Sequence, residues 1–266
     1  MSARAGPENV SSGLPASVRA CHEMVRIMLS GSLFDRPRAV TRLLLALCIA
    51  DFVLMSVVDR RIPFVLFGGS GTFGPPTIRS LVLAGGIFST LVDQEPYRLL
   101  SAVYVHLGLD HLALNMAALV SLGRSIEDRI GGARLLLLFV VTGILGFAVS
   151  RFYYGQVSPP TAGASGALFG FVGHDIGVLL SRRDPRAKEL ILQQLAYAVG
   201  FALLFSVNNA AHAGGFLAGI VLGYLFEIER HRLRHEPLFR SAALLCIALS
   251  ILSVVLSVRS VLSLSA

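Results

Sequence analysis

Apolar residues form long runs along most of this chain, and short polar clusters separate the runs. A helix needs about 20 apolar residues to cross the hydrocarbon core of a bilayer. The pattern predicts seven membrane-spanning helices, near residues 40–58, 103–123, 133–152, 163–181, 190–207, 212–227 and 239–258. The sequence therefore predicts an all-α polytopic membrane protein built as a helical bundle.

One further apolar stretch, residues 78–92, competes for the status of a span. Its apolar core has the length of an interfacial or re-entrant element, which is shorter than a bilayer crossing. An extra span here would also move every later arginine-rich connection to the opposite side of the membrane. We therefore expect residues 59–98 to form one long outer loop.

The basic residues predict the orientation of the bundle. Seventeen of the 23 Lys and Arg residues fall in the N-terminal tail and in the second, fourth and sixth connections. Basic connections stay on the cytoplasmic side, so we expect the N-terminus inside and the C-terminus outside. This predicts three parts: a cytoplasmic tail at 1–38, a six-helix core at 39–227, and a linker with a seventh helix at 228–266.

The composition supports this class and narrows the partners. The chain is 54% hydrophobic and 15% charged, with a mean hydropathy of +0.71, which is typical of a protein surrounded by lipid. The net charge of +7 follows from the topology, and no basic cluster with interleaved aromatics indicates nucleic-acid binding. Cys21, Cys48 and Cys246 lie in separate segments and predict no disulfide.

Five polar side chains lie within the expected membrane spans: His106, His111, Asn115, Ser165 and His212. Such groups in a span are candidates for function because burying them without a partner costs free energy. The second, fourth and sixth spans, which carry these groups, all run from the outer to the inner face. We therefore expect a hydroxyl, imidazoles and an amide to meet at one depth near the outer side.

This set of groups is suited to acyl transfer. Serine becomes a nucleophile when an adjacent base takes its proton, and Ser165 with His212 meets that need. His111 and Asn115 lie four residues apart on one helical face and can donate N–H groups to a developing oxyanion. No Asp or Glu lies near His212 in sequence or depth, so the sequence predicts a dyad.

Each motif also has a structural interpretation. Small residues such as Gly163 and Gly166 around the serine let membrane helices pack closely, and a histidine in a span often bonds a neighbouring carbonyl. Gly215, Gly219 and Gly223, spaced by four, predict a packing seam. A metal site at His106, His111 and His212 is disfavoured, because no carboxylate or cysteine joins them.

Four ordered motifs over residues 97–227 resemble the rhomboid family of intramembrane serine proteases. The second span matches H-x4-H-x3-N, the fourth G-x-S-G, and the sixth A-H-x2-G-x3-G, while an aromatic-Arg pair precedes them. In this chain the matching residues are Tyr97, Arg98, His106, His111, Asn115, Gly163, Ser165, Gly166, His212, Gly215 and Gly219.

The resemblance implies specific roles for these residues. Ser165 is expected to be the nucleophile and His212 its general base, with His111 and Asn115 stabilising the oxyanion and His106 near the mouth of the site. Phe169 stands where many relatives have Tyr, and its ring is expected to pack against His212.

The same resemblance implies single-pass transmembrane proteins as substrates, no cofactor, and membrane lipid as the environment. We expect a multi-pass location in a bacterial cytoplasmic membrane. Two other classes are weaker. A catalytically inactive rhomboid-like protein that binds membrane clients is disfavoured because Ser165 and His212 are both present. A proton-coupled transporter would show inverted repeats in matching halves, which we do not find in the sequence. Asp51 in the middle of the first span has no assigned role.

Overall fold

The computed structural model describes residues 33–60, 62–63, 75–155, 160–204, 208–232 and 235–264. Most of the tail expected at 1–38, including Cys21, lies outside these residues. So do parts of the expected loop 59–98 and the end of the expected span 190–207.

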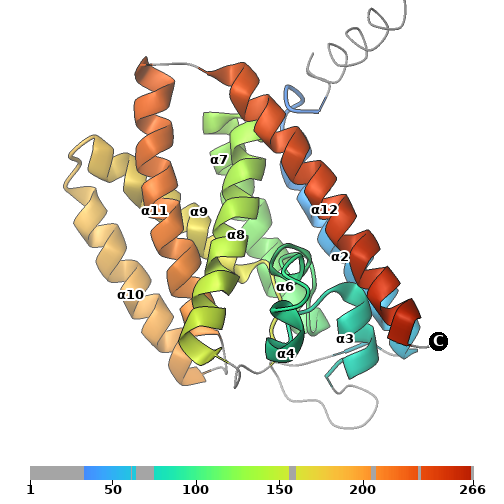
Figure 1. Cartoon of the computed structure of the whole chain (residues 1–266). Helices are drawn as coiled ribbons and strands as arrows, with labels where there is room; N and C mark the ends of the chain where they lie inside the picture. Colours follow the sequence, from blue (N-terminus) through green and yellow to red (C-terminus); the bar gives the residue numbers. More distant parts are fainter. Residues whose placement is uncertain are drawn as a thin grey trace, which may run out of the picture.

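The described residues form a helical bundle (Figure 1). Among the described residues, four helices are long and apolar enough to cross a membrane: α2 (Ala39–Asp59), α8 (Gly132–Tyr154), α11 (Asn209–Arg232) and α12 (Glu236–Leu264). The apolar helix α9 (Ser165–Ser181) is shorter. Helix α10 (Arg186–Leu204) occupies the region of the fifth expected span. The prediction of an all-α polytopic membrane fold is confirmed, while the number of spans and their orientation stay predictions.

The second span begins later than the sequence suggested. Residues 102–108 are not helical, and the helix starts at Leu109 as α6 (Leu109–Ala118). It continues through a π-helical turn (Leu119–Gly123) into α7 (Arg124–Ile130). The expected span 103–123 was therefore wrong at its start, because hydropathy does not distinguish a buried apolar loop from a helix. His106 consequently lies in the loop before the helix.

Residues 78–92 do not form a membrane-length helix, in agreement with their expected place in a loop. They contain the short helices α3 (Ile78–Ala84) and α4 (Ser89–Val92), and α5 (Arg98–Ser101) follows. Ile87, between α3 and α4, pairs its backbone with Thr161 through two N–H···O bonds of 3.0 Å. The loop therefore contacts the segment just before α9.

Glycines bring the backbones of α9 and α11 into direct contact. A Cβ atom added at Gly215 would lie 2.0 Å from the carbonyl oxygen of Gly166, and one at Gly219 would lie 2.0 Å from that of Gly170. At Gly223 the same addition would meet the carbonyl oxygen of His174 at 2.1 Å. The glycines for which the sequence predicted a packing seam therefore lie where α11 approaches α9.

A carboxylate from α7 holds the first turn of α2. Glu127 is buried and accepts hydrogen bonds from the backbone N–H groups of Val40 and Thr41, at 2.9 and 2.8 Å, and from the Thr41 hydroxyl at 2.6 Å. The first N–H groups of a helix have no partner inside the helix, and the helix dipole favours an anion there. Glu127 thereby connects α7 to the first turn of α2.

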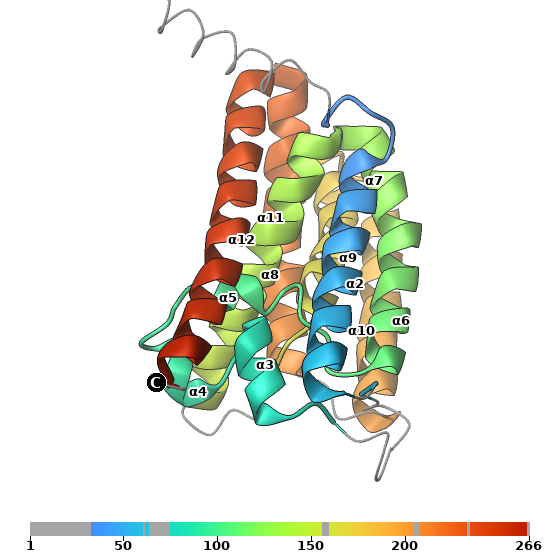
Figure 2. The same ribbon diagram turned by 90° about the vertical axis from the view of Figure 1, so that its right-hand side faces the viewer.

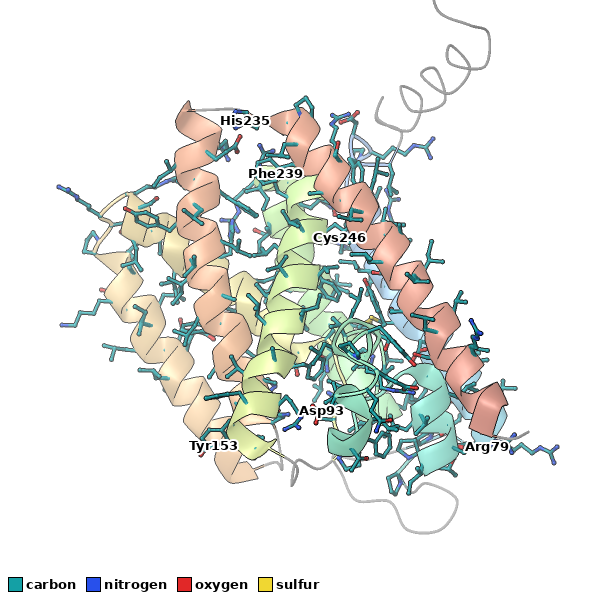
Figure 3. All side chains as sticks on the ribbon, viewed as in Figure 1. Arg79, Asp93, Tyr153, His235, Phe239 and Cys246 are labelled. Atoms are coloured by element: carbon teal, nitrogen blue, oxygen red, sulfur yellow. The ribbon has the colours of Figure 1, made fainter. Side chains whose placement is uncertain are left out.

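The two ends of the bundle differ in charge. Figure 3 shows His235 and Phe239 at the end where α11 connects to α12, and Arg79, Asp93 and Tyr153 at the opposite end. We call the first the arginine-rich end, because the ion pairs and hydrogen bonds of Arg129, Arg134, Arg182, Arg230 and Arg240 lie there. The helices α9 and α11 both finish at this end, so their first turns lie in the other half of the bundle (Figures 1 and 2).

Ion pairs connect the helices at the arginine-rich end. Arg134 of α8 has a nearly buried side chain that pairs with Glu229 of α11 at 2.8 Å and also with Glu236 of α12. Arg129 of α7 pairs with Asp175 of α9 at 2.8 Å. These contacts fix the helix ends that lie far from the first turns of α9 and α11.

Substitution of Gly219 by Val tests the contact between α9 and α11. The new side chain would overlap the Gly170 carbonyl, so we expect unfolding to become easier by about 1–3 kcal/mol, the usual cost of overpacking. Thermal unfolding in detergent measures the change. Ala213→Val on the exposed face of the same helix is the matched control, and an equal loss of stability in both variants would contradict the contact.

Candidate active site

The centre of the site is a hydrogen bond between two helices. Ser165 is the first residue of α9, and His212 lies in the first turn of α11. Nε2 of His212 and Oγ of Ser165 are 2.8 Å apart. Both side chains are half-buried. The glycine contacts between α9 and α11 explain this short distance, because each residue is on the helix face that meets the other helix.

Phe169 supports the imidazole ring of His212. The two rings are stacked, with centroids 4.4 Å apart and planes 19° apart. Phe169 follows Ser165 by one helical turn, so one face of α9 provides both the hydroxyl and the ring. The expected packing of Phe169 on His212 is present, and it restricts the orientation of the imidazole without a hydrogen bond.

Asn208 connects the elements that carry the two residues, and the sequence analysis did not single it out. Its Oδ1 accepts the backbone N–H of Ala211 at 3.0 Å, which caps the first turn of α11. Its Nδ2 donates to the hydroxyls of Ser150 on α8 and Thr161, at 2.7 and 3.1 Å. An asparagine directly before a helix is a known capping signal, and that signal was available in the sequence.

The turn before Ser165 depends on glycine. Gly163 has φ of +133°, which side chains rarely tolerate, and its N–H donates to the Ala102 carbonyl at 2.9 Å. A Cβ atom there would lie 2.7 Å from Cε1 of His111. Gly166, in contrast, is helical, and a Cβ atom would meet the Ala211 carbonyl oxygen at an ordinary 3.4 Å. Position 163 therefore requires glycine, whereas position 166 has space for a Cβ atom.

His106 is completely buried beside this turn. Its Nδ1 lies 3.0 Å from the carbonyl oxygen of Tyr104, and its Nε2 lies 3.5 Å from the backbone nitrogen of Ala164. A carbonyl oxygen only accepts, so Nδ1 carries the proton and the neutral ring offers Nε2 as an acceptor. The His106 ring also lies 5.3 Å from the His111 ring, centroid to centroid. His106 thus contacts the backbone next to Ser165 rather than the Ser165 hydroxyl.

Asn115 is buried on α6, one turn after His111. Its Nδ2 donates to the backbone carbonyl of His111 at 2.8 Å, and its Oδ1 has no hydrogen-bond partner among the described residues. The structure therefore brings Ser165, His212 and Phe169 into contact and places His111 against Gly163. The amide of Asn115 is bonded within its own helix.

The sequence analysis assigned no role to Asp51. Its Oδ2 atom is buried in α2 without a hydrogen-bond partner among the described residues. Nothing in the structure assigns it a role in the site.

Comparisons with known proteins identify related sequences. The sequence model of the Rhomboid domain family matches residues 93–229, more than half of the chain. The chain is 34% identical to "RHOMBOID-like protein 5" of Arabidopsis thaliana over 68% of its own length and 60% of that protein.

Two further relatives have names that describe an activity. "Rhomboid protease GluP" of Bacillus subtilis is 30% identical over 67% of this chain and 36% of the relative. "Rhomboid-type serine protease 2" of Emericella nidulans is 35% identical over 54% of this chain and 31% of the relative. The chain thus spans less than two thirds of the length of each of these relatives.

The two glycines around Ser165 make different predictions. Gly163→Ala should destabilise the fold by about 1–3 kcal/mol, because it strains the backbone and displaces His111. Gly166→Ala should leave stability equal or slightly higher, because alanine favours a helix and the space is sufficient. Thermal unfolding of both variants measures the difference, and a reversed order would refute this description of the turn.

Proposed function

Because this chain belongs to the rhomboid family, we propose that it is an intramembrane serine endopeptidase that uses Ser165 and His212 as a catalytic dyad. The observation that carries the proposal is the 2.8 Å contact between Ser165 Oγ and His212 Nε2. A hydroxyl within hydrogen-bond reach of an imidazole is the geometry that general-base activation requires. The relatives named as proteases support the same class of reaction.

The proposed reaction begins with proton transfer from Ser165 Oγ to Nε2 of neutral His212. The oxygen attacks the carbonyl carbon of the scissile peptide bond, and the imidazolium then gives the proton to the leaving amine. Water then attacks the acyl-enzyme carbonyl while His212 takes its proton, and the imidazolium returns a proton to Ser165 Oγ as the new carboxyl end leaves. Phe169 keeps the imidazole in place during both steps, because its ring stacks on that of His212.

The oxyanion is proposed to bind at the first turn of α9. Ala164, which precedes this turn, provides no side-chain cap, and the first N–H groups of a helix lack partners within the helix. The backbone N–H of Ser165 is therefore available to a developing negative charge. His111, which lies against Gly163, and Asn115 are the proposed side-chain donors. Asn115 has to leave its bond to the His111 carbonyl before it donates.

We propose single-pass membrane proteins as substrates, cleaved in or near their transmembrane segments. The site lies in the half of the bundle opposite to the arginine-rich end, and basic ends favour the cytoplasmic side. We therefore propose that cleavage occurs toward the outer surface. A bacterial cytoplasmic membrane stays a prediction, since the relatives above come from a plant, a bacterium and a fungus.

Three substitutions separate the proposed roles. Ser165→Ala and His212→Ala should each reduce cleavage of a single-pass substrate below detection, because neither variant can form the activated nucleophile. Asn115→Ala should retain activity lowered by about 10²–10³, the usual cost of one oxyanion donor. The assay uses purified protein in proteoliposomes, and the thermal unfolding of each variant confirms its fold.

The opposite results are equally informative. Cleavage that survives Ser165→Ala would reject the nucleophile, and complete absence of cleavage by the wild type across several substrates would favour a protein that only binds clients.

The proposal also predicts a dependence on pH. His212 has to be neutral to accept the serine proton, so the rate should fall in acid as the imidazole becomes protonated. Reaction of Ser165 with a fluorophosphonate probe should show the same acid limb as cleavage, because both need the same base. The measurement covers pH 4 to 9 with a check of the fold at each value. A flat profile in either reaction would remove His212 as the base.

A further inference from the structure

Helix α12, which occupies the region of the seventh expected span, contacts the loop that leads into the site. The Tyr97 hydroxyl donates to the Leu256 carbonyl of α12 at 3.4 Å. A Cβ atom at Gly85 would lie 2.7 Å from the Ser257 hydroxyl, so the backbone of the loop passes directly beside α12. Figure 2 shows α12 alongside α3 and α5. The helix is therefore placed to influence residues 85–106, which reach the turn before Ser165.

The contact nearest to the site joins Tyr104 to Ser250. Both residues are buried, and their hydroxyl oxygens are 2.8 Å apart. Ser250 donates its only hydroxyl proton to the carbonyl of Cys246 at 2.8 Å, one turn earlier on α12. Tyr104 is therefore the donor and Ser250 the acceptor between them. This is a directed hydrogen bond between α12 and the loop.

The same tyrosine contacts His106 through its backbone. The Tyr104 carbonyl accepts the Nδ1 proton of His106 at 3.0 Å, and His106 Nε2 faces the Ala164 N–H at 3.5 Å. Ala164 precedes Ser165 in the chain. A continuous series of hydrogen bonds thus runs from Cys246 and Ser250 of α12, through Tyr104 and His106, to the backbone of the catalytic turn.

We infer that α12 positions the catalytic turn, with Tyr104 and Ser250 as positioning residues for the reaction at Ser165. The inference rests on the endopeptidase activity proposed above. The side chain of Tyr104 is fixed at its hydroxyl end by α12, and this fixes the carbonyl that orients His106. The 3.5 Å contact to Ala164 is long, so a small shift of His106 removes it. Loss of that contact would shift the backbone that orients the Ser165 N–H toward the oxyanion.

A positioning role predicts a specific kinetic pattern. Misplacement of a catalytic geometry by about 1 Å is sufficient to lower the rate by about 10²-fold. We expect Tyr104→Phe and Ser250→Ala each to lower kcat by about tenfold to a hundredfold, with KM within about twofold of the wild type. Loss of an interaction that forms only in the transition state lowers kcat in this way without weakening substrate binding.

Helix α12 provides its own control. Ser253 is buried on the same helix, and its hydroxyl donates to the backbone carbonyl of Ser250, within α12. Ser253→Ala removes one buried hydroxyl, as Ser250→Ala does, but leaves the bond to Tyr104 intact. We expect its kcat to stay within about twofold of the wild type.

The experiment measures kcat and KM of full-length protein in proteoliposomes for the wild type, the three single variants and Tyr104→Phe/Ser250→Ala. The double variant should lose no more than either single variant, because both remove the same bond. A fluorophosphonate probe is applied in parallel. The final extent of Ser165 labelling should be unchanged, which shows that the fold persists, while its rate falls with kcat.

Several results would overturn the inference. The first is a kcat within twofold of the wild type in Tyr104→Phe and Ser250→Ala, and the second is an equal loss of kcat in Ser253→Ala. The inference also fails if the losses multiply in the double variant, or if a reduced final extent of Ser165 labelling accounts for the loss of activity. Failure of the proposed function looks different, since wild-type protein would then neither cleave substrate nor react with the probe at Ser165.

Discussion

The site depends on the contact between the backbones of α9 and α11. Gly215 and Gly219 on α11 face Gly166 and Gly170 on α9 so closely that a single methyl group would overlap a carbonyl oxygen. Inside a membrane, helices gain little from the hydrophobic effect and associate through close packing, which small residues permit. The 2.8 Å distance between Ser165 and His212 is a consequence of this packing.

Neighbouring elements preserve that contact. Helix α8 also approaches α11 closely, because a Cβ atom at Gly146 of α8 would lie 2.7 Å from the Ala211 carbonyl oxygen. Asn208 caps the start of α11 and bonds Thr161 in the segment that leads to Ser165. The elements that carry the hydroxyl and the imidazole are thus joined before their helices begin, and Phe169 then restricts the imidazole ring.

The loop before the second span also contacts the segments that surround the site. Arg98 is completely buried there and donates to the backbone carbonyls of Val82 and Gly86, which holds α3 and α5 together. Ile87 pairs with Thr161 in the segment that leads to Ser165. The loop also contacts α12, so a helix distant in sequence from Ser165 is connected to it through hydrogen-bonded neighbours. In the proposed mechanism these contacts fix donors before the substrate arrives, which is how preorganised sites stabilise charge.

The sequence by itself determined the helical membrane class, the glycine seam and the group of polar residues, because apolar run length and the cost of polar groups in hydrocarbon are local properties. It placed the second helix too early, since the buried loop at 102–108 is as apolar as a span. Only the tertiary structure decided that His106 contacts the backbone of Ala164, that Asn115 bonds its own helix and that Asn208 joins two elements. These contacts depend on where separate helices meet, which hydropathy and spacing do not specify.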